Sequence, residues 1–261
     1  MRMKIPYFQV DAFTKRRFGG NPAGVCLLQK WLPDAVLQNM AMEHNLSETA
    51  FLVRGASGWD LRWFTPQMEV DLCGHATLAS AFVIFNCLEH AGKSLHFNSR
   101  SGLLPVGRKR DLLMLDFPSR TATPSSAPKA LVAGLGRRAS EVYKARDYMA
   151  VYDAEEDIAA LTPDMASLMN VDSLGVIATA PGKRCDFVSR FFAPRVGVPE
   201  DPVTGSAHCT LIPYWSKRLN KKKLHALQLS KRGGELFCED RGGRVQIGGR
   251  AVLHLRGEIE L

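Results

Sequence analysis

A motif that occurs twice is the feature of this 261-residue chain that most constrains its fold. The first copy, RWFTP at residues 62–66, is followed by Val70, and the second, RFFAP at residues 190–194, is followed by Val198. The offset between the copies is 128 residues, and a Pro-Asp pair at 33–34 recurs at 163–164 with an offset of 130. Two matches in the same order, at an offset near half the chain length, indicate one unit that has been duplicated.

Hydrophobic periodicity and turn residues place the elements of this unit. Strands are predicted at 4–13, 23–28, 49–54 and 61–64, with more in 95–117, and helices at 33–44 and 74–88. We therefore expect an α+β fold with a first domain at residues 1–118, a Ser-, Thr- and Pro-rich linker at 119–128, and a second domain at 129–261. These boundaries leave open whether the last strand of the chain joins the first domain. Two related domains leave a cleft, a favoured place for a small ligand.

Composition excludes several classes of protein. The net charge of +8 comes mainly from short basic clusters at 15–17, 108–110 and 217–223, which lack the interleaved aromatics that stack on bases, so we expect no nucleic-acid partner. The opening MRMKIPYFQV has no apolar signal region, and no apolar run approaches the roughly 20 residues that span a bilayer. The six cysteines form no C-x-x-C pair, so reduced thiols are expected. These features predict a cytoplasmic chain without a membrane partner.

Each repeat continues into a glycine turn that opens an apolar stretch. The turns are Cys73-Gly74-His75-Ala76 in the first repeat and Thr204-Gly205-Ser206-Ala207 in the second. The first N–H groups of a helix lack intrahelical acceptors and favour negative charge, and glycine lets a ligand approach them closely. Two such turns facing one cleft would bind an anionic group, most simply a carboxylate. The alternative is that both are only tight strand-to-helix turns.

Two carboxyl groups are candidates for proton chemistry and substrate contact. Glu48 stands at the entry to a predicted strand beside apolar neighbours, where burial would raise its pKa toward the range of an acid/base catalyst. The matching segment of the second repeat, 172–176, contains no Glu, so this base would exist in one half only. Asp201 lies in a three-residue insertion before the second glycine turn and is either a turn former or a contact for a substrate amine or for His75.

The remaining candidates carry weaker signals. Cys73 precedes a helix start, a setting that favours a thiolate, but the aligned positions in the second repeat are Val203 or Thr204, so a second thiol base is missing. We expect no metal, because neither His44 nor His208 has a ligand partner three to five residues further on.

With these residues assembled, the sequence resembles the PhzF-like (phenazine biosynthesis-like) family, which shares the diaminopimelate epimerase fold. The resemblance covers essentially the whole chain and rests on four ordered motifs, at 18–25, 45–51, 71–77 and 190–206. It implies two pseudo-symmetric domains, each a curved, mostly antiparallel sheet around a central helix, with the active site in the interdomain cleft. It also implies a homodimer that uses neither cofactor nor metal.

The resemblance further implies that Glu48 is the catalytic acid/base and that His75 and Asp201 take part with it. The family's substrate contacts match at Gly74, His75, Asp201, Gly205 and Ser206, and we add their neighbours Ser47, Cys73 and Thr204 to the predicted substrate-binding set. The expected function is a cofactor-independent isomerase of a small carboxylate. Two alternatives stay open, a racemase or epimerase that depends on Cys73 and a non-catalytic interaction protein with a vestigial cleft.

Overall fold

A computed structural model describes residues 3–56 and 58–261, and the chain divides into two compact units. The first unit runs to Asp116 and includes the C-terminal segment Gly248–Leu261, and the second unit is the continuous segment Phe117–Ile247. The first unit therefore contains both ends of the chain.

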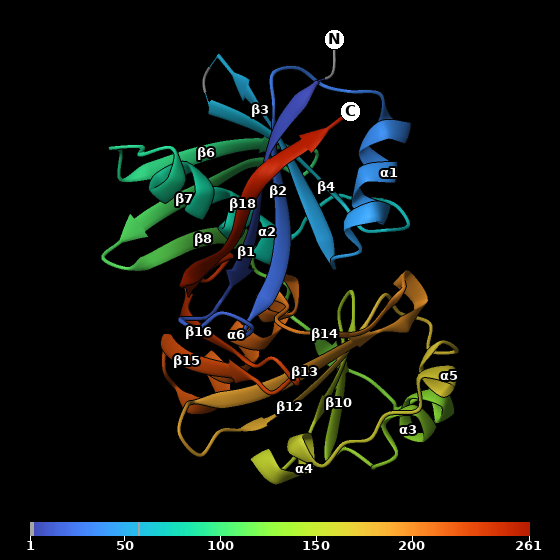
Figure 1. Ribbon diagram of the computed structural model, residues 1–261. Helices are drawn as coiled ribbons and strands as arrows, with labels where there is room; N and C mark the ends of the chain where they lie inside the picture. The colour runs from blue at the N-terminus through green and yellow to red at the C-terminus, as the bar shows by residue number, and fades with distance from the viewer. Residues whose placement is uncertain (1–2, 57) are drawn as a thin grey trace. The chain divides into compact units, whose positions relative to one another are not determined.

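The first unit is a curved sheet wrapped around a buried helix (Figure 1). Its strands pair in the order β18-β1-β2-β3-β4-β6-β7-β8, and the short β5 pairs with the end of β4 on the same edge as β6. The β2–β3 and β4–β6 pairs are parallel and the others antiparallel. The bounds of these strands are β1 Lys4–Ala12, β2 Asn21–Leu28, β3 Glu48–Gly55, β4 Gly58–Phe64, β5 Glu69–Val70, β6 Ser94–Ser99, β7 Gly102–Lys109, β8 Leu112–Pro118 and β18 Ala251–Glu260.

The helix inside this sheet is α2 (Gly74–Phe82), which packs against β1, β2, β3 and β18. Every residue from Gly74 to Ala81 is buried, as the all-round apolar sequence predicts. The predicted helix to residue 88 is shorter, because α2 passes at Val83 into a π-helical turn, Val83–Cys87. The other helix of the unit, α1 (Asp34–His44), buries Leu37, Met40 and Ala41, and it ends at Asn45, which takes the left-handed conformation.

The second unit repeats the strand pairings of the first. Its order is β9-β10-β11-β12-β13-β15-β16, with β14 paired to the end of β13 on the same edge as β15, and the parallel pairs are β11–β12 and β13–β15. The strands are β9 Thr123–Pro124, β10 Glu141–Lys144, β11 Tyr148–Val151, β12 Val176–Pro181, β13 Phe187–Ala193, β14 Val198–Asp201, β15 Lys223–Gln228, β16 Gly234–Asp240 and β17 Arg244–Gly249. The helices are α3 Lys129–Leu135, α4 Glu155–Ala159, α5 Met165–Leu168 and α6 Gly205–Leu219. The predicted fold class, a duplicated α+β unit, is confirmed.

The repeated sequence motif forms the same structure in both units. Arg62 donates two hydrogen bonds to Glu69 at 2.7 Å, and Arg190 donates two to Glu200 at 2.7 and 2.9 Å. Each guanidinium also lies over the second aromatic ring of its own motif, Phe64 in one case and Phe192 in the other. The arginine thus ties the inner strand of each sheet to the short strand that leads into the central helix.

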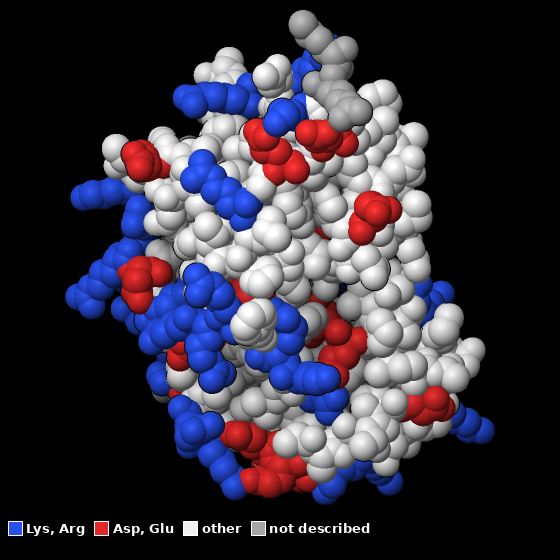
Figure 2. Space-filling view, in the orientation of Figure 1, with Lys and Arg blue, Asp and Glu red and all other residues white. Residues whose placement is uncertain are grey.

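The charged surface is mixed. On the face drawn in Figure 2, basic side chains lie among acidic ones. In the basic cluster at 217–223, Arg218 pairs with Glu141 at 2.5 Å and Lys221 with Asp186 at 2.7 Å. Within the described part of the chain, none of the helices has the length and apolar character needed to cross a bilayer. All six cysteines lie in that part and are free thiols.

One glycine shows why the two units differ where β3 and its counterpart β12 begin. Ala50 pairs with Trp63 in the first unit, and Ile177 pairs with Phe191 in the second, so Glu48 corresponds to Gly175. A Cβ atom added at Gly175 would lie 2.2 Å from the ring of Phe191. The buried aromatic ring therefore excludes any side chain at this position.

Replacement of this glycine should be destabilising. We expect Gly175→Ala to lower the free energy of unfolding by about 1–3 kcal/mol, because the Phe191 ring must shift in a packed core. Gly107→Ala on β7 is the matched control, since nothing lies within 4 Å of an added Cβ there, and it should stay within about 0.5 kcal/mol of the parent. Urea denaturation measures both, and equal stabilities of the two variants would contradict the packing argument.

Candidate active site

The amino end of α2 gathers polar groups in the otherwise apolar interior of the first unit. Cys73 caps the helix in an extended conformation, and its carbonyl accepts a 2.5 Å hydrogen bond from the Thr77 hydroxyl one turn further on. Gly74 and His75 are the first two helical residues, so their N–H groups have no partner within the helix. The predicted strand-to-helix turn is therefore present, and it is buried.

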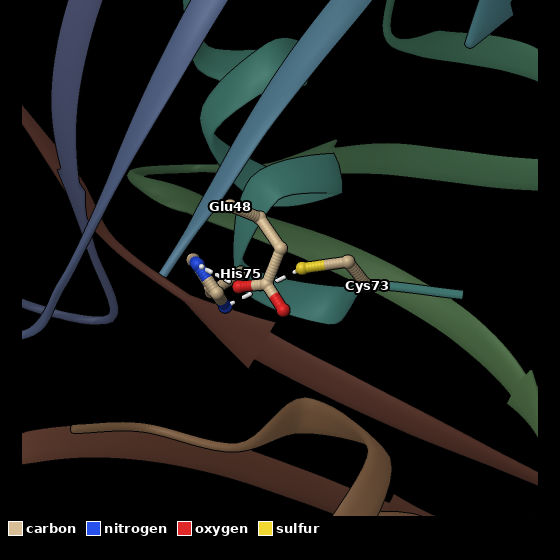
Figure 3. A group of neighbouring side chains, drawn as sticks. All are labelled: Glu48, Cys73 and His75. Carbon is tan, nitrogen blue, oxygen red and sulfur yellow. Dashed lines mark hydrogen bonds and ion pairs between the residues drawn. The ribbon is translucent and has the colours of Figure 1, made fainter. Parts of the chain in front are cut away.

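His75 is fixed from two sides. Its Nδ1 lies 3.1 Å from the amide nitrogen of Asn21 at the start of β2, and its Nε2 lies 3.2 Å from Oε2 of Glu48 at the start of β3 (Figure 3). Because the Asn21 amide nitrogen is a donor, Nδ1 accepts and the ring proton is on Nε2, facing the carboxylate. Burial lowers the pKa of His75 to about 3, so the ring is neutral near pH 7 and lies against Glu48 as an uncharged neighbour.

Glu48 has the position that an acid/base residue needs. It is the first residue of β3, opposite Ala23 of the parallel neighbour β2, and its side chain is 16% exposed. The Sγ atom of Cys73 completes the group and lies 3.5 Å from Nδ1 of His75. A carboxylate, a neutral imidazole and a thiol thus meet at one helix end.

The turn before β3 positions Glu48 through its neighbours. Ser47 is half-buried directly before the strand. The hydroxyl of Thr49 lies 3.0 Å from Nδ1 of His44 at the end of α1, and the His44 ring lies 4.6 Å from the ring of Tyr7. His44 therefore contacts the residue that follows Glu48 in β3.

In the second unit the corresponding helix α6 begins at Gly205, with Thr204 as its cap. The Thr204 carbonyl is 2.8 Å from Nδ1 of His208, whose pKa burial lowers to about 4, so a neutral ring donates this bond. His208 thus occupies the position that Thr77 has in α2. The same bond pattern closes the first turn of both central helices.

Asp201 is held beside this cap. Its Oδ2 accepts a 2.5 Å hydrogen bond from the Thr204 hydroxyl, and its carbonyl accepts one of 2.8 Å from Nε2 of Gln228. The Gln228 side chain also accepts from the Thr204 N–H at 2.8 Å and donates to the Thr204 hydroxyl at 3.1 Å. Gln228 is 1% exposed, so one buried amide organises the whole turn.

Ser206 is the second helical residue of α6, and a guanidinium orients its hydroxyl. Nη2 of Arg146 donates to Ser206 Oγ at 3.1 Å, and the same arginine donates to both oxygens of the buried Asp147 at 2.8–3.3 Å. Because Oγ accepts from Arg146, the hydroxyl proton of Ser206 is directed away from it and is available to an anion. Asn21 thus contacts His75, the second residue of α2, and Arg146 contacts Ser206, the second residue of α6.

The predicted site residues fall into two sets, one in each unit. The first unit brings together Glu48, Cys73, Gly74 and His75, with Ser47 adjacent in the chain, and the second brings together Asp201, Thr204, Gly205 and Ser206. Asn21 lies inside the quoted motif at 18–25, so its spacing offered a signal. Arg146 and Gln228 lie outside every motif, and only the folded strands carry them to the turn.

The whole chain has close relatives with the same architecture. The family profile of phenazine biosynthesis-like (PhzC–PhzF) proteins matches residues 10–257. The chain belongs to the phenazine biosynthesis-like family. Two uncharacterized isomerases of Pseudomonas aeruginosa are 52% identical to it over 259 and 260 residues, covering 99% of this chain and 100% of theirs.

Solved structures agree with this membership. A phenazine biosynthesis protein of the PhzF family from Enterococcus faecalis superposes with a TM-score of 0.96 at 51% identity, covering 99% of this chain and 100% of that one. A hydroxyproline epimerase from Agrobacterium vitis superposes with a TM-score of 0.65 at 10% identity, over 100% of this chain and 94% of that one, and shows the fold alone. The expected phenazine biosynthesis-like family and epimerase-like fold are thus confirmed.

The Gln228 network provides a test of the second set. Gln228→Leu should lower the free energy of unfolding by about 1–3 kcal/mol, because the Thr204 N–H loses its acceptor in a buried place. The control is Gln67→Leu in an exposed turn, which should leave stability within about 0.5 kcal/mol. Thermal and urea unfolding give both values, and an unchanged stability of Gln228→Leu would show that the turn does not depend on this amide.

Proposed function

We propose that this protein is a cofactor-independent isomerase that moves a proton within a small carboxylate substrate, with Glu48 as the single acid/base. The observation that supports it most is the approach of His75 Nε2 to Glu48 Oε2 at 3.2 Å, at the amino end of a buried helix. The names of the two Pseudomonas relatives point to the same class of reaction.

In this proposal Glu48 takes a proton from one carbon of the substrate and returns it to another. The electron pair of the broken C–H bond moves into the substrate's conjugated system, and the new C–H bond forms with the same proton, so no redox partner is needed. His75 keeps the carboxylate oriented. Since its pKa is about 3, the ring does not take the proton from Glu48.

The other predicted residues have binding roles. The N–H groups at Gly74 and Gly205 and the Ser206 hydroxyl would hold the substrate carboxylate, because helix amino ends stabilise anions. His75 and Asp201 would orient an amine or hydroxyl of the substrate, while Ser47, Cys73 and Thr204 line the site. The proposal includes a homodimeric, cytoplasmic enzyme that needs no cofactor, as the family resemblance implies.

A racemase that depends on Cys73 is the alternative with the most chemical support. Its thiol is next to His75, but two-base racemisation needs a second base, and the corresponding cap in α6 is Thr204, a hydroxyl. The two hypotheses therefore make different predictions. Substitution of Glu48 abolishes proton exchange under the proposal, and substitution of Cys73 abolishes it under the thiol alternative. If no small carboxylate binds at all, the non-catalytic alternative replaces both.

The first test uses proton exchange. Small carboxylates are screened by thermal shift, and each hit is incubated in deuterium oxide with the protein. Glu48→Gln should slow deuterium incorporation by about 10²–10⁴-fold, the usual contribution of a general base, while the thermal shift and the fold are retained. Glu43→Gln, on the exposed side of α1, is the matched control and should exchange at the parent rate. Full exchange by Glu48→Gln, with loss in Cys73→Ser, would favour the thiol alternative.

The second test concerns Arg146. Arg146→Lys keeps a cation beside Asp147 but removes the planar fork that reaches Ser206, so we expect binding of the same carboxylates to weaken about fivefold to tenfold, the worth of one hydrogen bond. Arg184→Met, at an exposed position, should leave binding unchanged. Calorimetric titration measures both, and equal affinities of parent and Arg146→Lys would remove Arg146 from the binding role.

A further inference from the structure

The side chains of Glu48, Cys73 and His75 form a group of three different metal-ligating atoms. A carboxylate oxygen, a thiol sulfur and an imidazole nitrogen lie within 4.8 Å of one another, and they converge from β3 and the start of α2 (Figure 3). Cys73 and His75 are buried, and Glu48 is partly exposed. The sequence expectation of no metal rested on the spacing of possible ligands around His44 and His208 and on the family resemblance, whereas here the fold supplies the third ligand from a different element.

The chemistry of this set fits zinc. Thiolate, imidazole and carboxylate are the three side-chain ligands of zinc, with metal–ligand distances of about 2.0–2.3 Å. Two ligand atoms on one tetrahedral zinc therefore lie about 3.3–3.6 Å apart. The Nε2–Oε2 separation of 3.2 Å is close to this value, so among the heavy atoms of the three ligands the main movement needed is a turn of the Cys73 side chain, whose sulfur now lies 3.5 Å from Nδ1, toward the other two.

The surroundings support a cation at this place. Carboxylate and thiolate together carry two negative charges, which balance Zn²⁺, and the amino end of α2 stabilises the thiolate form. Asn21 contacts the other ring nitrogen of His75, and a turn of its amide would supply the acceptor oxygen that metal-binding histidines use as an outer partner.

We propose that Glu48, Cys73 and His75 bind one zinc ion, and that bound zinc blocks the acid/base group of the site. On binding, the Cys73 thiol releases one proton to solvent and forms an S–Zn bond. The proton on Nε2 of His75 moves to Nδ1, and rotation of the Asn21 amide lets its oxygen accept that proton. Cys73 and His75 would then hold the metal when a weakly bound substrate competes for the site.

The binding test uses Co²⁺ as a spectroscopic substitute for zinc and needs no substrate. Chelator-treated protein titrated with Co²⁺ should show a thiolate-to-cobalt charge-transfer band that saturates at one equivalent and disappears when Zn²⁺ is added. Cys73→Ala and Cys73→Ser should lack the band, and His75→Gln should weaken Zn²⁺ binding at least tenfold. Cys87→Ala, at a half-buried thiol in the π-helical turn, is the control and should keep the band. Circular dichroism checks that each variant is folded.

Two results would overturn the site: no band in the parent protein, or a band that survives in folded Cys73→Ala or Cys73→Ser. The blocking part rests on the proposed function and has a separate readout. Zn²⁺ should stop deuterium exchange of a carboxylate hit, and a chelator should restore it, whereas exchange that continues with zinc bound would contradict blocking. Absence of exchange without zinc counts against the proposed isomerase only, because the cobalt titration is independent of it.

Discussion

A helix whose first turn is buried has to satisfy that turn from its own sequence and from the strands around it, and both units of this protein are organised by that requirement. In α2 the cap carbonyl of Cys73 is bonded by Thr77, and in α6 that of Thr204 is bonded by His208. The N–H groups of the first helical residues remain directed beyond the helix. Polar side chains gather at these two helix ends, and the proposed chemistry uses them.

The two units agree in what supports the helix and differ in what stands at its end. The Arg62–Glu69 and Arg190–Glu200 pairs are equivalent, as are the strand pairings. At the helix end, however, the second helical residue is His75 in the first unit and Ser206 in the second, and Gly175 stands where the first unit has Glu48. Duplication therefore supplied a scaffold twice, and substitution at a few positions gave each copy a separate role.

The duplication was predictable from sequence because its markers are structural. The arginine, the aromatic pair and the proline of the repeated motif all have packing or ion-pairing roles that the fold needs in both copies. The Glu48–His75 association was likewise expected in outline, since both residues lie in short, ordered motifs. The motifs identify these residues, and the strand pairing determines which of them come into contact.

Other features depended on tertiary structure. A register shift between β13 and β14 absorbs the three inserted residues, so Asp201, and not Val198, pairs with Phe191. The Pro-Asp signal opens an 11-residue helix at Asp34 but only a four-residue one at Met165, because the local signal fixes where a helix starts and packing fixes its length. Gln228 and Arg146 come from strands and loops far from the turns they hold, and local sequence carries no trace of such contacts.

The pairing of β1 with β18 has a consequence for how the chain is made. Residues near the two ends exchange backbone hydrogen bonds, Met3 with Leu261 at 2.9–3.0 Å, so an early strand of the first unit waits for one of the last segments to be synthesised. The second unit is continuous and is complete before that segment leaves the ribosome. Translation therefore favours folding of the second unit first, with the Glu48 unit closed only after β18 has been synthesised.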